Sequence, residues 1–288
     1  MKNIFGKALL LAVIVLPALP GLAQETPNGK ELQFFPKGHL FDPVYLDPTE
    51  NQIQGGMYSY WINNDWQDKL YASFALGFQR EILRWEKNKA HLFSFGISAT
   101  TFTQFELIEP TGVSLSNLLN NDFKVGGQFS YRSGNVSMRI RYWHVSTHLG
   151  DDFIFRYNIP GWYINPVIYE QIDLLLSEER KHFRYYGGFG IVTNSTYARK
   201  RASLHWGFSF NKALKNDYFR WIAGVDVRML EHFNYRPNVN LAAGLEIGER
   251  NKHPIRVMLQ YYNGHLPYSW YEYLSTQWLG LSMSFSAF

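Results

Sequence analysis

Apolar and polar residues alternate along many short segments of this chain, with the two-residue period of β-strands. Residues 70–78, 123–131 and 279–285 each place apolar side chains at every second position. One face of such a strand suits lipid and the other suits a polar interior. We predict twelve strands of this kind, near residues 54–63, 69–82, 91–104, 122–132, 136–147, 166–177, 182–194, 202–211, 218–229, 238–247, 255–263 and 276–288.

The connections between these strands are expected to alternate in length. Residues 133–135 and 178–181 form short turns, whereas residues 105–121, 148–165 and 264–275 form the longest gaps. Outer-membrane barrels have short periplasmic turns and longer external loops. A soluble β-sandwich would also alternate, but it would not produce this asymmetry. We therefore predict an all-β fold, a single antiparallel transmembrane β-barrel of about 12 strands over residues 54–288.

The N-terminal region is expected to be separate from the barrel strands. Residues 1–23 are typical of a signal peptide, because Lys2 and Lys7 precede an apolar stretch and small residues surround Ala23. An uncleaved membrane anchor is the alternative, but the apolar stretch is short for a membrane span. Residues 24–53 contain four prolines and do not alternate, so they indicate an N-terminal periplasmic or plug segment.

Composition adds the cellular setting. Aromatic residues make up 17% of the chain, which suits the lipid-facing wall and its interfacial belts. The absence of cysteine excludes a disulfide, a thiolate metal site and a cysteine nucleophile. Removing Lys2 and Lys7 lowers the net charge from +4 to +2, since 4 − 2 = 2, and no nucleic-acid partner is indicated. We expect the outer membrane of a Gram-negative bacterium, with outer-membrane lipids and the barrel assembly machinery as partners.

Candidate chemistry lies on the strand predicted at residues 136–147. Its outward row ends in His144 and Ser146, which stand about 6.5–7 Å apart along the strand. A serine hydroxyl attacks an ester once a base accepts its proton, and the base needs a third group to orient it. If the short turns lie at one level, antiparallel pairing places Glu170 opposite His144. We therefore predict three catalytic residues: Ser146 as nucleophile, His144 as base and Glu170 as orienting residue.

The sequence also allows a simpler explanation of the His144–Ser146 pair and other residues in the orienting role. Histidine and serine are common where strands reach the membrane interface, so the pair is also explained as interfacial decoration. Asn158 and Asn165 are substitutes for the orienting residue. His148, Asp151 and Asp152 form a hydrogen-bonded loop corner, or the two aspartates supply oxygen ligands for Ca²⁺, the one cofactor that the sequence leaves open. The sequence shows no phosphate-binding glycine loop, zinc motif or dinucleotide fingerprint.

The His-x-Ser pair on an outward strand of a twelve-stranded barrel resembles outer-membrane phospholipase A. The lipid A 3-O-deacylases are similar too, with a His-x-Ser pair and an acidic third residue. The resemblance implies hydrolysis of an acyl ester of phospholipid or lipid A, with His144, Ser146 and either Glu170 or Asn158 in the catalytic roles. The chain departs from the phospholipase directly after Ser146, where Thr147 follows instead of Asn-Gly.

A second resemblance, to an uncharacterised bacterial outer-membrane family with a domain of unknown function, extends over most of the mature chain. It rests on residues 35–36, 40–41, 47–48, 141–151, 164–165, 173–175, 185–188 and 261–264. This family implies no activity. We therefore expect a lipid acyl-ester hydrolase, with a homodimer left open, and keep a non-catalytic barrel in transport, adhesion or envelope structure as the alternative. A filled lumen would favour an enzyme or a structural barrel, whereas an open polar channel would favour transport.

Overall fold

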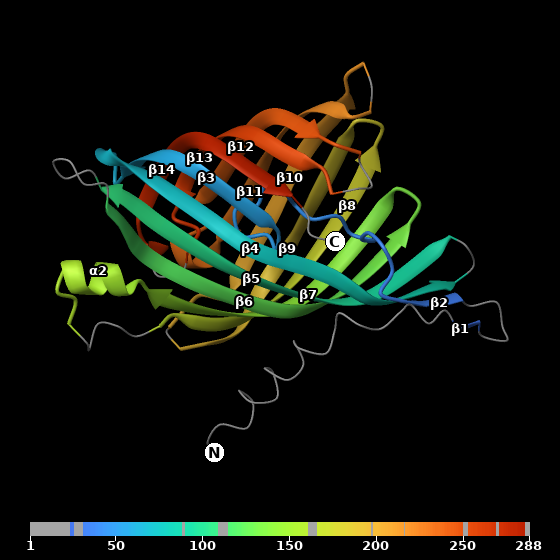
Figure 1. The fold of residues 1–288 in the computed structure, drawn as a ribbon. Helices are drawn as coiled ribbons and strands as arrows, with labels where there is room; N and C mark the ends of the chain where they lie inside the picture. Colours follow the sequence, from blue (N-terminus) through green and yellow to red (C-terminus); the bar gives the residue numbers. More distant parts are fainter. Residues whose placement is uncertain are drawn as a thin grey trace.

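The chain forms a closed antiparallel β-barrel. The computed structural model describes residues 24–25, 31–87, 90–108, 115–160, 166–196, 198–215, 217–249, 253–268 and 271–285. The barrel strands are β3 (Ile53–Ile62), β4 (Asp65–Lys87), β5 (His91–Ile108), β6 (Leu115–Ser133), β7 (Val136–Leu149), β8 (Ile168–Arg180), β9 (Phe183–Ser195), β10 (Ala202–Ala213), β11 (Phe219–Leu230), β12 (Pro237–Ile247), β13 (Ile255–His265) and β14 (Ser275–Phe285). Each pairs with its sequence neighbours, and β14 pairs with β3 to close the barrel (Figure 1). The predicted all-β barrel of 12 strands is confirmed.

Alternation along the strands appears as alternation between an outer wall and a filled interior. Phe74, Ile140 and Leu281 are 38%, 39% and 63% exposed on the outer wall, as their apolar rows predict. The residues that alternate with these apolar positions face inward. On either side of Ile140, for example, the side chains of Arg139 and Arg141 are each only 1% exposed to solvent. Apolar residues outside and polar residues inside are the pattern of a barrel that faces lipid.

Two expectations about the connections have different outcomes. The turns after β6 and β8 are short, as predicted, and the connection between β7 and β8 is long. The prediction of a loop at residues 105–121 is largely wrong, because β5 continues to Ile108 and β6 begins at Leu115. Polar residues in this stretch belong to strand pairs: Asn117 donates a hydrogen bond of 3.2 Å to Glu106, which also forms an ion pair with Lys69.

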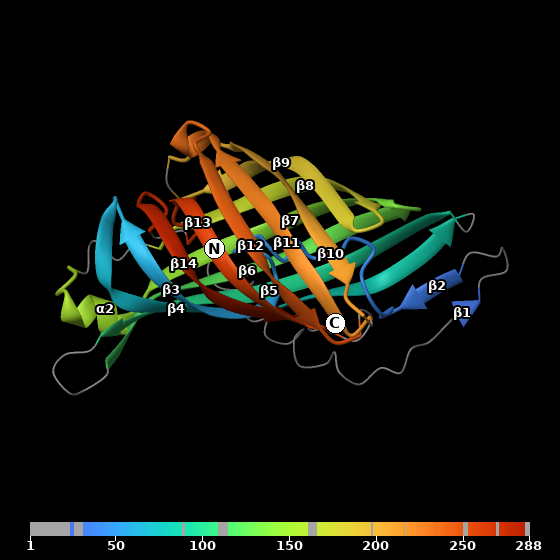
Figure 2. The same cartoon turned by 90° about the horizontal axis from the view of Figure 1, so that it is seen from above.

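Smaller elements lie at the two ends of the barrel. The strand β2 (Glu31–Phe34) pairs with the long strand β4, and β1 (Gln24–Glu25) pairs with β2. The helix α2 (Asp151–Arg156) lies at the opposite end (Figures 1 and 2). The short 3-10 helix η2 (Glu231–Phe233) follows β11. No helix among the described residues is long and apolar enough to cross a membrane. Two features singled out in the sequence lie outside the described residues: the segment 1–23 and Asn165.

Residues 35–52, here called the inner segment, contact inward side chains from strands around the barrel. Arg184 of β9 donates hydrogen bonds to the backbone oxygens of Asp42 and Pro43. Glu81 of β4 accepts a hydrogen bond of 2.6 Å from the backbone of Leu40. The Phe41 side chain is fully buried between guanidinium groups. The inner segment therefore fills part of the lumen.

Candidate functional site

The outward face of β7 carries a row of polar side chains at the end of the strand where α2 follows. Tyr142 is 48% exposed, and His144 and Ser146 follow it in the same row, partly exposed. The residues between them, Trp143 and Val145, are buried on the lumen side. The candidate nucleophile and the candidate base therefore share the outer face, and neither points into the lumen.

Glu170 of β8 lies beside His144. The two residues are direct partners in the β7–β8 pairing, which confirms the register expected from the short turns. The Nδ1 atom of His144 is 3.3 Å from Oε1 of Glu170. Their side chains are 39% and 24% exposed. A carboxylate at this position can hold the imidazole in the tautomer that carries a proton on Nδ1, which leaves Nε2 to accept one.

Ser146 has a different hydrogen-bond partner from the one expected. Its Oγ atom lies 3.1 Å from Nε2 of His148, the next residue in the outward row. The expected bond between Ser146 and His144 is not formed within the described residues. Ser146 stands in the outward row between two histidines, each two residues away along β7.

The sequence reasoning grouped His148 with Asp151 and Asp152 and missed it as the partner of Ser146. Its ring packs edge-on against Phe123 of β6, with the ring centroids 5.8 Å apart. The signal was present in the sequence, because His148 continues the same alternating row as His144 and Ser146. Of the substitutes for Glu170, Asn158 follows α2 with a left-handed φ of 49° and has no hydrogen bond with His144 among the described residues.

Asp151 and Asp152 form the first turn of α2. One oxygen of Asp152 accepts a hydrogen bond of 3.3 Å from the backbone of Leu118. Ca²⁺ requires six to eight oxygen ligands. In the part of the chain that the structure describes, no group of three or more acidic or histidine side chains could hold a metal ion. The two aspartates therefore do not build a calcium site by themselves.

The lumen face of β7 is held by buried charges. Glu50 of the inner segment accepts hydrogen bonds from Arg139 and Arg141, at 2.8 Å and 2.7 Å. Arg141 also lies 3.5 Å from Asp173 of β8, and Trp143 donates a hydrogen bond to the same carboxylate. These contacts inside the lumen therefore stabilise β7, which carries His144 on its outer face.

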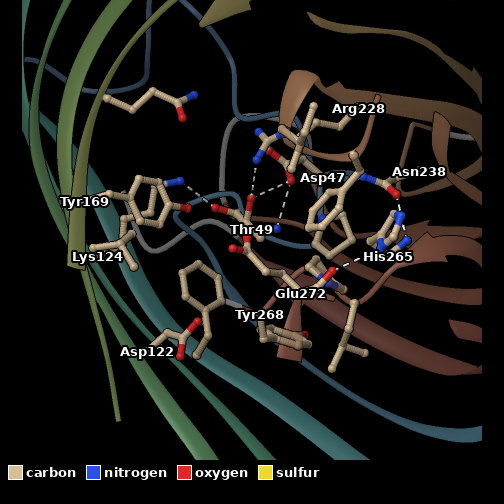
Figure 3. Close-up of a pocket in the computed structure, with 18 of the residues that line it drawn as sticks. Asp47, Thr49, Asp122, Lys124, Tyr169, Arg228, Asn238, His265, Tyr268 and Glu272 are labelled. Atoms are coloured by element: carbon tan, nitrogen blue, oxygen red, sulfur yellow. Dashed lines mark hydrogen bonds and ion pairs between the residues drawn. The ribbon is translucent and has the colours of Figure 1, made fainter. Parts of the chain in front are cut away.

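Aromatic and polar side chains fill the rest of the described lumen. Tyr60 stacks on Tyr71, with the ring centroids 4.4 Å apart, and Tyr262 stacks on Trp278 at 3.9 Å. Between this cluster and the inner segment lies a cavity of about 70 Å³ (Figure 3). Such filling favours an enzyme or a structural barrel over a transport channel.

These observations define the class: the chain is a barrel of the outer-membrane type. A family model described as "protein of unknown function (DUF1207)" matches residues 27–287, and the chain belongs to this family. No curated protein matches the chain.

Solved structures of outer membrane phospholipase A share the fold. The enzyme from Escherichia coli is 13% identical with a TM-score of 0.54, over 82% of this chain and 90% of that chain. An active-site mutant of the same enzyme has a TM-score of 0.56 at 13% identity, over 91% and 94% of the two chains. The Salmonella typhi phospholipase, solved as a dimer with bound calcium, gives 0.54 at 13% identity, over 83% and 93%. At this identity the likeness shows a common barrel and carries no activity with it.

Proposed function

We propose that this protein is an outer-membrane enzyme of a Gram-negative bacterium that hydrolyses an acyl ester of an outer-leaflet lipid, either a phospholipid or lipid A. The observation that carries the proposal is the 3.3 Å contact between His144 Nδ1 and Glu170 Oε1 on the outer wall, two residues along β7 from Ser146. These three groups, a base, its orienting carboxylate and a hydroxyl, lie on a lipid-facing wall. A substrate that reaches them there would be a lipid rather than a soluble molecule.

The proposed reaction uses the three residues in the usual order of a serine hydrolase. Ser146 Oγ attacks the ester carbonyl carbon while His144 Nε2 accepts the hydroxyl proton. The imidazolium is stabilised by Glu170, and it returns the proton to the leaving alcohol as the ester bond breaks. Water then attacks the acyl-enzyme with His144 again as base, which releases the fatty acid and restores Ser146.

This reaction requires Ser146 to turn from His148 toward His144. The 3.1 Å bond between Ser146 and His148 offers a second arrangement, in which His148 accepts the proton directly. The carboxylate contact of His144 favours His144 as the base, because a carboxylate partner stabilises the imidazolium that forms.

The proposal includes the setting of the enzyme. Residues 1–23 would be removed on export, residues 24–53 would form the N-terminal segment, and the barrel assembly machinery would insert residues 54–288. A homodimer is proposed as the assembly, supported by the dimeric Salmonella typhi phospholipase of similar fold.

The test is lipid analysis of membranes that contain the intact protein, Ser146→Ala or Ser116→Ala. Ser116 is an exposed serine on the neighbouring strand β6 and serves as the matched control. We expect free fatty acid and deacylated lipid to accumulate with the intact protein and with Ser116→Ala, and not with Ser146→Ala. Equal lipid profiles for all three would refute the hydrolase.

A non-catalytic barrel in adhesion or envelope structure is the second candidate. The observation that favours it is the filled lumen, in which Arg139, Arg141 and Glu50 form a buried ionic network that a purely structural barrel would also need. The same lipid analysis separates the candidates, because a structural barrel leaves lipid composition independent of Ser146.

A further inference from the structure

The cavity inside the barrel lies between the inner segment and the end of the barrel that carries α2. Its volume of about 70 Å³ gives room for about five water molecules. Figure 3 shows its lining residues, with Lys124 of β6 and Arg228 of β11 reaching Thr49 of the inner segment from different walls. Phe102 and Tyr268 supply apolar surface. The cavity therefore combines a polar floor with aromatic walls.

Lys124 is the unusual group in this cavity. It is 3% exposed, and its Nζ atom donates a hydrogen bond of 2.9 Å to the backbone oxygen of Thr49. The ammonium group also lies 4.5 Å from the centre of the Trp143 ring. An ammonium group has three donors, and a buried cation is costly unless it is paired. Lys124 forms no ion pair with any described residue.

The carboxylates around the cavity have other partners. Asp47 pairs with Arg228 at 2.8 Å, Asp226 pairs with His205 at 2.7 Å, and Glu272 pairs with Arg199. Asp122, two residues before Lys124 on the same face, accepts hydrogen bonds from Thr147 and Asn120. The lining thus offers the N–H donors of Lys124 without a carboxylate at ion-pair distance from them.

We propose that this cavity binds a small carboxylate, with its oxygens on Lys124 and a short apolar body against the aromatic walls. A carboxylate offers acceptors only, which matches a site whose spare groups are donors. A single negative charge balances the single ammonium group, whereas a doubly charged phosphate would leave a buried charge without a partner. The volume of the cavity is enough for a ligand of roughly the six non-hydrogen atoms of butyrate. This site is separate from the outer-wall residues His144 and Ser146.

The experiment is calorimetric titration of the purified full-length barrel in non-ionic detergent with butyrate, the neutral isostere butyramide and inorganic phosphate. Three variants accompany the wild type: Lys124→Met, Lys124→Arg and Lys212→Met. Lys212 is an exposed lysine on β10 and controls for the loss of a charge elsewhere. Gel mobility before and after heating verifies that each barrel is folded.

We expect saturable binding of butyrate to the wild type and to Lys212→Met, and binding at least tenfold weaker to Lys124→Met. Lys124→Arg should retain binding, since it keeps the positive charge. Weaker binding to Lys124→Met would then reflect the lost charge and not a displaced inner segment. Butyramide and phosphate should bind more weakly than butyrate. Absence of saturable butyrate binding, equal affinity in Lys124→Met, or equal affinity for butyramide would each overturn the proposal.

Discussion

The Glu50 carboxylate accepts a hydrogen bond of 2.8 Å from Nη2 of Arg139, and both side chains are excluded from solvent. Arg141, two residues along β7, donates to the other oxygen of Glu50. Both arginines lie on the lumen face of β7, whose outer face carries His144 and Ser146. The inner segment therefore holds the lumen face of β7 in place behind the candidate site.

Replacing Glu50 with glutamine should destabilise the barrel strongly. The change removes the carboxylate that the two buried guanidinium groups share, although Arg141 keeps its contact with Asp173. Loss of one partner from a buried ion pair typically costs about 3–5 kcal/mol. Glu178→Gln is the control, because Glu178 pairs with Arg180 at the surface and such pairs are worth about 0–1 kcal/mol. The free energy of unfolding in guanidinium chloride measures both. Equal effects of the two substitutions would show that the buried contact is not stabilising.

Acid should weaken the hold of the inner segment on the barrel. Burial alone would raise the pKa of Asp47, but the positive charges around it, that of Arg228 first, together outweigh burial and lower the pKa from 3.8 to about 2. Because the folded-state pKa lies below the unfolded one, the carboxylate stabilises the protein above about pH 4. This stabilisation, on the order of 2 kcal/mol, is lost as the pH falls from about 4 to about 2.

Asp47→Asn tests this pH dependence. The variant should be less stable than the wild type at neutral pH, and its stability should change less between pH 4 and pH 2. Unfolding midpoints measured at several pH values give both results. Parallel curves for the two proteins would mean that Asp47 does not contribute. The pKa of Glu50 is also held well below its ordinary value, because Arg139 and Arg141 outweigh burial, so part of the acid sensitivity should persist in the variant.

Two adjacent glycines of β6 should respond differently to alanine. A Cβ atom at Gly126 would lie 2.3 Å from the backbone oxygen of Tyr142 and 2.8 Å from the Cβ of Trp143, so β7 would have to shift. At Gly127 the nearest atom, on Phe95, is 3.8 Å away. We expect Gly126→Ala to cost about 1–3 kcal/mol and Gly127→Ala less than about 1 kcal/mol. Comparable unfolding midpoints for the two variants would contradict this.

The strand positions were predictable because one face of each strand is lipid-facing and the other polar. The period of two fixes which residues point outward, and short turns fix which residues pair, so the partnership of His144 with Glu170 followed from position alone. The extension of β5 and β6 beyond the apolar band was not predictable in this way. Its inward residues, such as Glu106 and Asn117, pair with each other and read as loop in the sequence.

Side-chain partners were harder to foresee than strands. The alternating pattern places Ser146 between His144 and His148 with equal spacing, and it does not say which ring the hydroxyl meets. Glu50 gave no signal as the partner of Arg139, because it lies in a proline-rich segment without periodicity and about ninety positions away. Only the closed barrel brings the inner segment against β7.

The identity of the general base should appear in the kinetics of single and double variants. We expect His144→Ala to lower turnover of a phospholipid or lipid A substrate in mixed micelles by about 10²–10⁴-fold. Adding Ser146→Ala to it should cause little further loss, because residues that act as one unit are not additive. Glu170→Gln should cost less than His144→Ala, since Glu170 orients the base without accepting the proton from Ser146.

His148→Ala is the matched control for this experiment, because it removes a histidine at the same spacing from Ser146 on the same face. With His144 as base, His148→Ala should keep most of the activity, since Ser146 then only loses a resting-state partner. The reverse ranking would assign proton transfer to His148 and leave the His144–Glu170 contact a structural one. If neither substitution changes turnover, the outer-wall cluster is interfacial decoration, and the barrel works without hydrolysis at Ser146.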